Sequence, residues 1–248
     1  MKVIIAHLYR GVNRRYWVTS MSAIFLIFIS IFHPILEYLR EGGVIPQGYH
    51  DAIVLNALSS DVWMFFTPIL AGIPFASEYV EDIKSKFVQS VLIRESYSSY
   101  LLGHAFTCWF SGSSALLLGV TVAYALVTLI VLPMESVTQN TQEMNSIVAV
   151  QLLLLALNGG LWASVGMAMS TFMESKYIAF ASPFVIYYLL VILCERYIPS
   201  SYILCPKNWR TPEIWPYDAW GTTAFLLELT LAFSILFAIR AERRLREL

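Results

Sequence analysis

Charged residues are scarce in this chain, and their scarcity excludes an ordinary soluble domain. Only 13% of the 248 residues are charged, whereas 58% are hydrophobic, and the mean hydropathy is +0.64. This apolar fraction is well above that of a soluble globular protein. The formal net charge of -1 gives no basic surface of the kind that nucleic acid requires, so nucleic-acid binding is not expected.

Motifs for chemistry are also missing. The sequence contains no G-x-x-x-x-G-K-[ST], so the chain itself is not expected to bind ATP, and no H-E-x-x-H of a zinc protease. Its four histidines are scattered without a His/Cys cluster at ligand spacing, so we predict no metal site. The sequence therefore predicts neither an enzyme nor a cofactor in this chain.

Long apolar runs are what the sequence has instead. A helix that crosses ~30 Å of hydrocarbon needs about 20 residues, and a spanning segment is helical because it must satisfy its own backbone hydrogen bonds. We predict an all-α polytopic membrane protein, a single domain over residues 1–248 with six transmembrane helices. The expected spans are about 17–36, 58–77, 103–132, 147–171, 177–194 and 219–239.

The basic residues predict the orientation. With six spans, twelve Lys and Arg residues fall on one face and four on the other. By the positive-inside rule both termini are cytoplasmic, and the chain is expected in the cell membrane. The third run is too long for one perpendicular span, but splitting it would place the basic tail outside, so we predict one long tilted helix there.

The first 16 residues have no signal-peptide pattern. Ile5, Leu8, Val12 and Tyr16 recur at helical spacing, which predicts an amphipathic helix over 1–16 that lies on the inner leaflet and leads into the first span. The alternative is an ordinary basic flank that only sets the topology.

The segment from Glu78 to Arg94, between the second and third spans, is expected on the cytoplasmic side. Val80, Ile83, Phe87 and Val91 recur at helical spacing and predict one amphipathic helix with one apolar stripe, while its acidic residues face elsewhere. Acidic groups are repelled by an anionic leaflet, so this face favours a protein partner over lipid.

The chain resembles a family at this point. The run Pro68 to Glu78, the amphipathic segment, and the run Arg94 to His104 are similar to the second-span, coupling-helix and third-span region of ABC-2 type permeases, the membrane subunits of ATP-binding-cassette exporters. Positions that fit are the acidic residues that open the cytoplasmic helix and the Arg that precedes a Ser-x-x-Tyr step into the third span. These positions are Glu78, Glu81, Arg94, Ser96 and Tyr100.

The resemblance implies a permease homodimer seated on separate ABC ATPase subunits, which hold the ATP and Mg, in contact with membrane lipid. It also implies that the cytoplasmic helix couples the permease to the ATPase. The residues expected to do so are Glu78, Glu81, Asp82, Lys84, Lys86, Phe87 and Arg94.

The same resemblance implies that the second and fifth spans line the cavity of the dimer. Aromatic rings there would accept an amphipathic or apolar cargo by contact; alternatively they are ordinary packing or lipid-facing residues. The residues expected along this path are Trp63, Phe66, Thr67, Phe184, Tyr187 and Tyr188.

Glu228 falls near the middle of the last span, where a carboxylate costs about 3 kcal/mol on insertion scales. It either contacts a cationic group or a proton along the path, or is a protonated, hydrogen-bonded group that ties helices together. Cys194 and Cys205 lie on the outer side, where a disulfide and two free thiols are both open.

Two other classes of function compete with an exporter subunit. A membrane enzyme needs a dense acidic or histidine motif, which is missing. A non-transporting membrane partner, such as an immunity or scaffold protein, needs the same spans but no ATPase. The expected cargo is an antimicrobial peptide, a drug-like amphiphile or a lipid-like molecule, with export of a peptide for self-protection preferred.

Overall fold

The computed structural model describes residues 2–41, 45–93, 96–135, 142–198 and 201–246. Helices make up nearly all of these residues, and within the described ranges the only β pairing is an isolated bridge between Ile45 and Glu135. The prediction of an all-α chain is confirmed.

Five helices are long and apolar enough to cross a membrane, and a bent pair of shorter helices would make a sixth. The pair is α3 (Tyr49–Ser59) and α4 (Asp61–Gly72), which meet at 67°. The five long helices are α2 (Arg14–Glu41), α7 (Tyr97–Val131), α8 (Gln142–Met173), α9 (Lys176–Ile192) and α10 (Asp218–Leu245).

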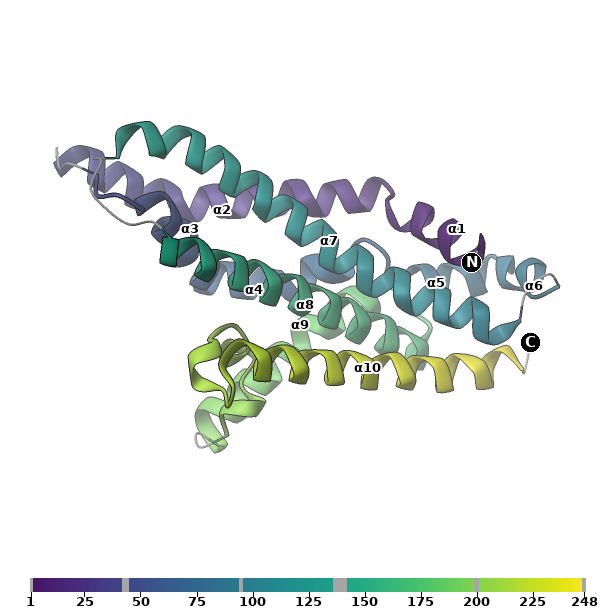
Figure 1. Cartoon of the computed structure of the whole chain (residues 1–248). Coiled ribbons are helices and arrows are strands. Elements are labelled where there is room, and N and C mark those ends of the chain that lie inside the picture. The colour runs from purple at the N-terminus through teal and green to yellow at the C-terminus, as the bar shows by residue number, and fades with distance from the viewer. Residues whose placement is uncertain (1, 42–44, 94–95, 136–141, 199–200, 247–248) are drawn as a thin grey trace.

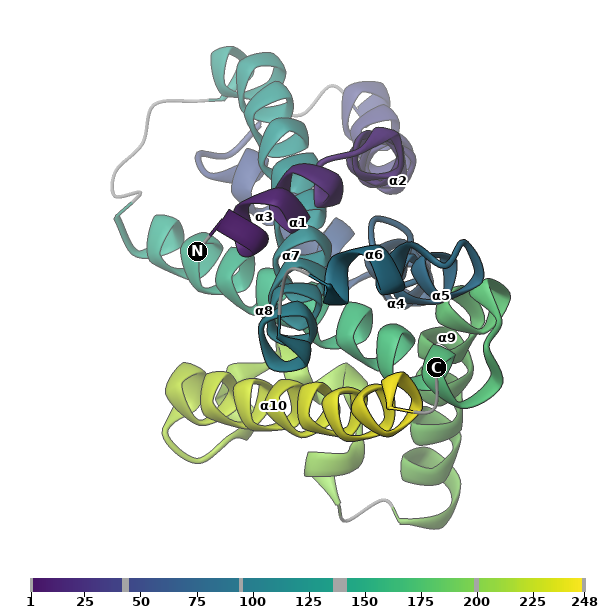
Figure 2. The same cartoon turned by 90° about the vertical axis from the view of Figure 1, so that its right-hand side faces the viewer.

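The long helices run side by side, and both termini lie at the same end of the bundle (Figure 1). We call this the terminal end; it also holds α1 (Lys2–Gly11), α5 (Glu78–Lys84) and α6 (Phe87–Leu92), which Figure 2 shows from that end. The opposite end holds α3 and the short helices between α9 and α10. These are a π-helical turn (Leu193–Tyr197), η3 (Tyr202–Leu204), η4 (Pro206–Arg210) and η5 (Pro212–Ile214).

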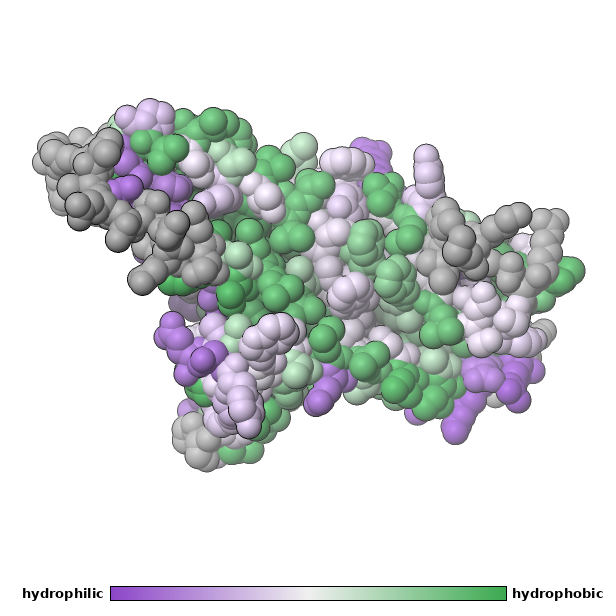
Figure 3. Space-filling view, viewed as in Figure 1, coloured by the Kyte–Doolittle hydropathy of each residue, from purple (hydrophilic) through white to green (hydrophobic). Residues whose placement is uncertain are grey.

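The core sits where α7 crosses α8. A Cβ on Gly112 of α7 would lie 2.9 Å from the carbonyl oxygen of Gly159 on α8, so the two backbones touch there. Small residues allow this close approach, as is usual where helices associate in membranes. Large apolar side chains such as Phe25 and Leu129 remain exposed on the outer faces of the helices. Figure 3 shows hydrophobic residues over much of the middle of one face.

The second predicted span, 58–77, is wrong as one continuous helix. The Ser60 hydroxyl accepts a hydrogen bond from the Trp63 N–H at 3.2 Å and caps α4, while the backbone of Ser60 (φ -67°, ψ 148°) is extended. An extended capping residue ends one helix and starts the next in a new direction. The helix α4 then stops at Gly72 and is followed by turns. Hydropathy alone gave no sign of this break.

The third predicted span is confirmed as one helix, because α7 continues without interruption from Tyr97 to Val131. The N-terminal helix is shorter than the predicted 1–16. It ends at Gly11, and Asn13 accepts a hydrogen bond from the Tyr16 N–H at 3.1 Å, which caps the start of α2. One face of this N-terminal helix packs on α7, where His7 is buried, and the other face is directed outward.

The cysteine alternatives are resolved in favour of free thiols. Cys194 and Cys205 are both buried and unpaired by any disulfide, and the Cys194 thiol donates to the carbonyl of Ser201 at 3.0 Å.

Candidate functional site

A cluster of charged and aromatic side chains joins four helices at the terminal end, and Asp82 of α5 is its centre. Its carboxylate accepts hydrogen bonds from Arg10 Nη1 and Nη2 at 3.0 and 2.7 Å, from the Tyr100 hydroxyl at 2.9 Å and from His104 Nε2 at 3.1 Å. Only 4% of its side chain is exposed. A single carboxylate therefore links α5 to both α1 and α7.

Two arginines extend this cluster to α2. Arg10 Nη2 also pairs with Glu78 at 2.8 Å, and Arg15, in the first turn of α2, pairs with Glu81 at 2.9 Å and donates to the Ser77 hydroxyl at 2.8 Å. Charge-assisted bonds of this kind are shorter and stronger than neutral ones. We call the following residues the Asp82 cluster: Arg10, Arg15, Glu78, Glu81, Asp82, Tyr100 and His104.

Glycines allow α1 to reach α7 and complete the cluster. A Cβ on Gly103 would lie 2.9 Å from His7 Cδ2, and a Cβ on Gly11 would lie 2.8 Å from Thr107 Cγ2. Both distances are shorter than side chains tolerate, so any larger residue would push the two helices apart. The docking of His7 between Tyr100 and His104, at ring distances of 5.4 and 4.5 Å, depends on these two positions.

The electrostatics of the cluster favour a charged Asp82 and a neutral His7. Burial alone raises the pKa of Asp82, but the hydrogen bonds from His104 and Arg10 hold that pKa well below its usual range. Burial, together with the neighbouring charges of His104 and Arg10, lowers the pKa of His7 to about 4. Burial raises the pKa of Glu78 above its ordinary value, although Arg10 and Arg15 oppose the shift.

The predicted single coupling helix over 78–94 is wrong. It is split into α5 and α6 by a turn at Ser85 and Lys86, where Lys86 has a left-handed backbone (φ 58°). The register of the apolar stripe is lost at this turn, so Val80 and Val88 are buried while Phe87 is 44% exposed. A positive φ at a lysine leaves no signal in apolar periodicity, so the sequence reading could not detect it.

The expected coupling residues fall into two groups. Glu78 and Asp82 face inward in the Asp82 cluster, and Glu81 lies at its edge. Lys84, Lys86 and Phe87 are exposed around the turn, where the Arg10 guanidinium lies 5.1 Å from the Phe87 ring centre. Arg94 lies outside the described residues.

Sequence reasoning missed the partners of these acids, which are Arg10, Arg15, Tyr100 and His104. The available signal was the concentration of acidic residues in Glu78–Lys84 on the same predicted face as the basic N-terminal segment. Opposite charges on one side of a membrane are natural partners, but their pairing needs the packing of α1 on α7, which the sequence does not display.

The predicted substrate-path residues gather where α4 meets α9. Phe184 and Tyr188 of α9 pack on Phe65 of α4 at ring distances of 5.0 and 5.6 Å, and Phe66 stands beside Phe65 at 4.9 Å. Trp63 and Thr67 are buried on α4, and Tyr187 is buried on α9. The structure thus brings together the residues of the second and fifth predicted spans, with Phe65 as an additional member.

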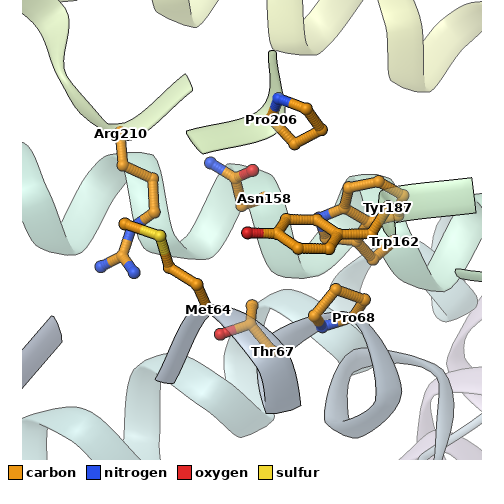
Figure 4. A pocket seen from close by; sticks show the side chains of 8 residues that line it. All are labelled: Met64, Thr67, Pro68, Asn158, Trp162, Tyr187, Pro206 and Arg210. Atoms are coloured by element: carbon orange, nitrogen blue, oxygen red, sulfur yellow. The ribbon is translucent and has the colours of Figure 1, made fainter. Parts of the chain in front are cut away.

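A pocket opens beside them, at the end of the bundle opposite to the termini. Its open volume is about 10 Å³, which is close to the space that one water molecule needs. Arg210 of η4 reaches into it with Asn158, Tyr187 and Thr67 nearby (Figure 4). The remaining walls are the apolar or aromatic residues Met64, Pro68, Trp162 and Pro206.

Glu228 does not join this region. Its side chain is exposed on α10, whose main neighbours are α7 and α8, and it makes no hydrogen bond to any residue that the structure describes. Within the described residues it therefore ties no helices together through a hydrogen bond, and both expected roles of Glu228 remain predictions. The position of Glu228 along the predicted span 219–239 indicated a depth near the middle of the membrane. Which face of the helix turns outward depends on packing, which the sequence does not show.

No known protein family, no curated protein and no solved structure matches the chain. The described residues form an all-α protein whose long apolar helices are suited to a membrane. Any narrower conclusion about this protein rests on the geometry of its two polar sites.

Proposed function

We propose that this chain is the membrane-spanning permease subunit of an ATP-binding-cassette exporter. In this proposal a homodimer moves an amphipathic or hydrophobic molecule across the cell membrane, with an antimicrobial peptide exported for self-protection as the preferred cargo. A separate ABC ATPase subunit binds ATP and Mg and supplies the energy.

The position of the termini supports the six-span topology of this proposal. Both termini lie at the same end of the bundle, which requires an even number of crossings (Figure 1). Five long helices alone would leave the termini at opposite ends, so we take the bent pair α3 and α4 as the second crossing. The basic residues near both termini then favour a cytoplasmic terminal end.

The observation that carries the proposal is the attachment of α5 to α1 and α7 through Asp82. The α5–α6 segment leads directly from α4 into α7, and its exposed turn faces outward at the terminal end. A force on that turn is therefore transmitted from α5 to α1, α2 and α7 through the short ion pairs and hydrogen bonds of the Asp82 cluster. A flexible loop would not transmit it. Such rigid connections are how domain motions are transmitted.

In this proposal the expected coupling residues have two different roles, attachment of the segment to the bundle and contact with the ATPase. Glu78, Glu81 and Asp82 hold the segment in place, because their carboxylates pair with Arg10 and Arg15. Lys84, Lys86 and Phe87 are exposed and would contact the ATPase. Two cations and an aromatic ring fit an acidic groove with an apolar floor on that partner.

Site-specific photo-crosslinking tests this assignment. A photoreactive residue at Phe87 is expected to capture the ATPase encoded with this chain. One at Tyr217, which directly precedes α10 at the opposite end and is more exposed than Phe87, is not. The double variant Lys84→Glu and Lys86→Glu should lose ATP-dependent clearance of a fluorescent amphipathic peptide from membrane vesicles. The matched variant Arg243→Glu, an exposed charge at the same end, should keep it.

Equal capture from both positions, or full transport by the double variant, would show that the α5–α6 turn does not couple to an ATPase. Repeated purification without any ATP-binding subunit would favour the non-transporting class, an immunity or scaffold protein with the same spans.

A further inference from the structure

The pocket opposite to the termini contains hydrogen-bond donors that have no acceptor. Arg210 is 9% exposed and Tyr187 is 6% exposed, yet Arg210 Nε and the Tyr187 hydroxyl have no partner among the residues that the structure describes. Buried polar groups are nearly always paired, and unpaired ones need an explanation. Two such groups at one small pocket indicate a missing ligand.

Among the residues that the structure describes, Arg210 has no counter-ion, and no carboxylate contributes to its electrostatics. Its one side-chain hydrogen bond to these residues runs from Nη1 to the carbonyl oxygen of Leu58, near the end of α3, at 2.5 Å. The side chain of Asp61, at the start of α4, is exposed. Burial lowers the pKa of Arg210 to about 10, so the guanidinium is still charged at neutral pH. A buried charge without a partner is strongly unfavourable, and an incoming anion would relieve that penalty.

The arrangement of the pocket fits an oxyanion. Figure 4 shows Arg210, Tyr187 and Asn158 among the side chains that line the pocket, with the Arg210 side chain beside Met64. The Asn158 amide donates to the carbonyl of Leu154 at 2.9 Å, which leaves its second N–H for a ligand. Each of these groups can donate a hydrogen bond, and the Arg210 guanidinium is also a cation, so a carboxylate or phosphate oxygen is a suitable acceptor for the set; the Asn158 carbonyl oxygen and the Tyr187 hydroxyl can also accept.

The surroundings of the donors are apolar. Tyr187 packs on Trp162 at 5.7 Å and on Tyr188 at 5.5 Å, and Tyr188 belongs to the aromatic surface that α4 and α9 share. A bound molecule would therefore meet cations and hydroxyls at one end and aromatic rings along its length. This is the chemistry of an amphiphile with an acidic head.

We propose that this site, the Arg210 pocket, binds the carboxylate or phosphate head of an acidic amphiphile, with Arg210 as its counter-ion and Tyr187 and Asn158 as hydrogen-bond donors. An oxyanion is larger than the present void, so the pocket must widen when the head enters. The proposal is independent of transport, because it concerns binding to the isolated chain.

Binding to the purified full chain in a neutral detergent tests the site. The probes are decanoate, decanol with the same tail and no charge, and acetate with the same head and no tail. Decanoate is expected to raise the melting temperature in a saturable way, whereas decanol and acetate are not. Arg210→Gln should weaken decanoate binding by at least about tenfold and Tyr187→Phe by about threefold, because they remove an ion pair and one hydrogen bond.

Arg196→Gln is the matched control, because it removes the same charge from an exposed position of the same outer segment and should bind decanoate like the wild type. If Arg210→Gln does not fold, Arg210→Lys and Tyr187→Phe decide the matter, since both keep the size of the side chain. Equal binding of decanoate and decanol, or wild-type binding by the Arg210 and Tyr187 variants, would overturn the proposal.

A second arm identifies the source of the head group. The same titration is made in nanodiscs of phosphatidylcholine alone and of phosphatidylcholine mixed with phosphatidylglycerol. If a membrane phospholipid occupies the pocket, phosphatidylglycerol will weaken decanoate binding in the wild type and in Tyr187→Phe, which keeps Arg210, but not the residual binding of Arg210→Gln. If the affinity is unchanged by phosphatidylglycerol, the occupant is a free acidic amphiphile.

Discussion

At the terminal end Asp82 accepts hydrogen bonds from three side chains, whereas at the opposite end Arg210 Nε and the Tyr187 hydroxyl have no acceptor. Both regions bury charge, yet the buried carboxylate of Asp82 is surrounded by donors from the chain, whereas Arg210 Nε has no acceptor among the described residues; His7 Nδ1 and His104 Nδ1 at the terminal end are also without a described partner. A carboxylate that accepts from several helices fixes those helices relative to one another, while an unpaired cationic donor is suited to a ligand that supplies the missing acceptor. The mechanical role proposed for the Asp82 cluster and the binding role proposed for the Arg210 pocket both rest on this contrast.

The largest effect is expected from Asp82→Asn. The change leaves Arg10 and its buried neighbours without their carboxylate, and breaking a buried pair in this way costs about 3–5 kcal/mol. The free energy of unfolding, measured by denaturant titration in detergent, should fall by that amount. Glu81→Gln is the control, because Glu81 is 37% exposed, and its loss should be below about 1 kcal/mol. A small effect of Asp82→Asn would mean that the cluster does not hold the helices.

The pH dependence of stability should report on His7. Its pKa is 6.5 when unfolded and about 4 when folded, so above pH 6.5 the residue is neutral in both states and has no effect. As the pH falls from 6.5 to 4, only the unfolded state takes up the proton, and up to about 3 kcal/mol of stability is lost. The depressed pKa of Asp82 adds a separate loss that begins below about pH 4.

His7→Phe should flatten the curve between pH 6.5 and 4, and His33→Phe, at an exposed histidine of α2, should leave it unchanged. Thermal melting of the detergent-solubilised variants at stepped pH values measures both. An identical curve for His7→Phe and the wild type would place the titration elsewhere.

Removal of one hydroxyl from each region compares them directly. The Tyr100 hydroxyl donates to Asp82, and a hydrogen bond to a charged group contributes about 1.5–3 kcal/mol, so Tyr100→Phe should lose that much. The Tyr187 hydroxyl has no described partner, so Tyr187→Phe should be within about 0.5 kcal/mol of the wild type without ligand. Equal losses in the two variants would contradict the contrast between the regions.

A small effect, of either sign, is expected from Arg210→Met. The change removes an unpaired buried charge and one hydrogen bond to Leu58, so the two contributions oppose each other. The unfolding free energy should stay within about 1 kcal/mol of the wild type or rise. A loss as large as that of Asp82→Asn would show that Arg210 already has a strong partner within the chain.

Several parts of the fold were predictable from the sequence because hydropathy reports burial in lipid directly. The long helix α7 was expected as one unit over 103–132, and α8 and α10 contain their predicted spans. The break at Ser60 and the turn at Lys86 were not, because each depends on the backbone conformation of one residue within an apolar or amphipathic pattern.

The sites divide in the same way. Glu78, Asp82 and Tyr187 were singled out from the sequence, but Arg10, His104 and Arg210, which define what those residues do, were not. Arg10 and Asp82 are separated by 72 positions in the chain, and no local pattern connects them.

The sequence by itself determined that this chain is all-helical, that several of its helices suit a membrane, and that basic residues gather on one face, since these properties are sums over many residues. Only the tertiary structure decided that Asp82 is enclosed by donors, that Arg210 is buried with no described acceptor for its Nε, and that Glu228 faces outward. Those outcomes depend on which helix faces meet, and that is set by close approaches at single residues such as Gly103 and Gly112.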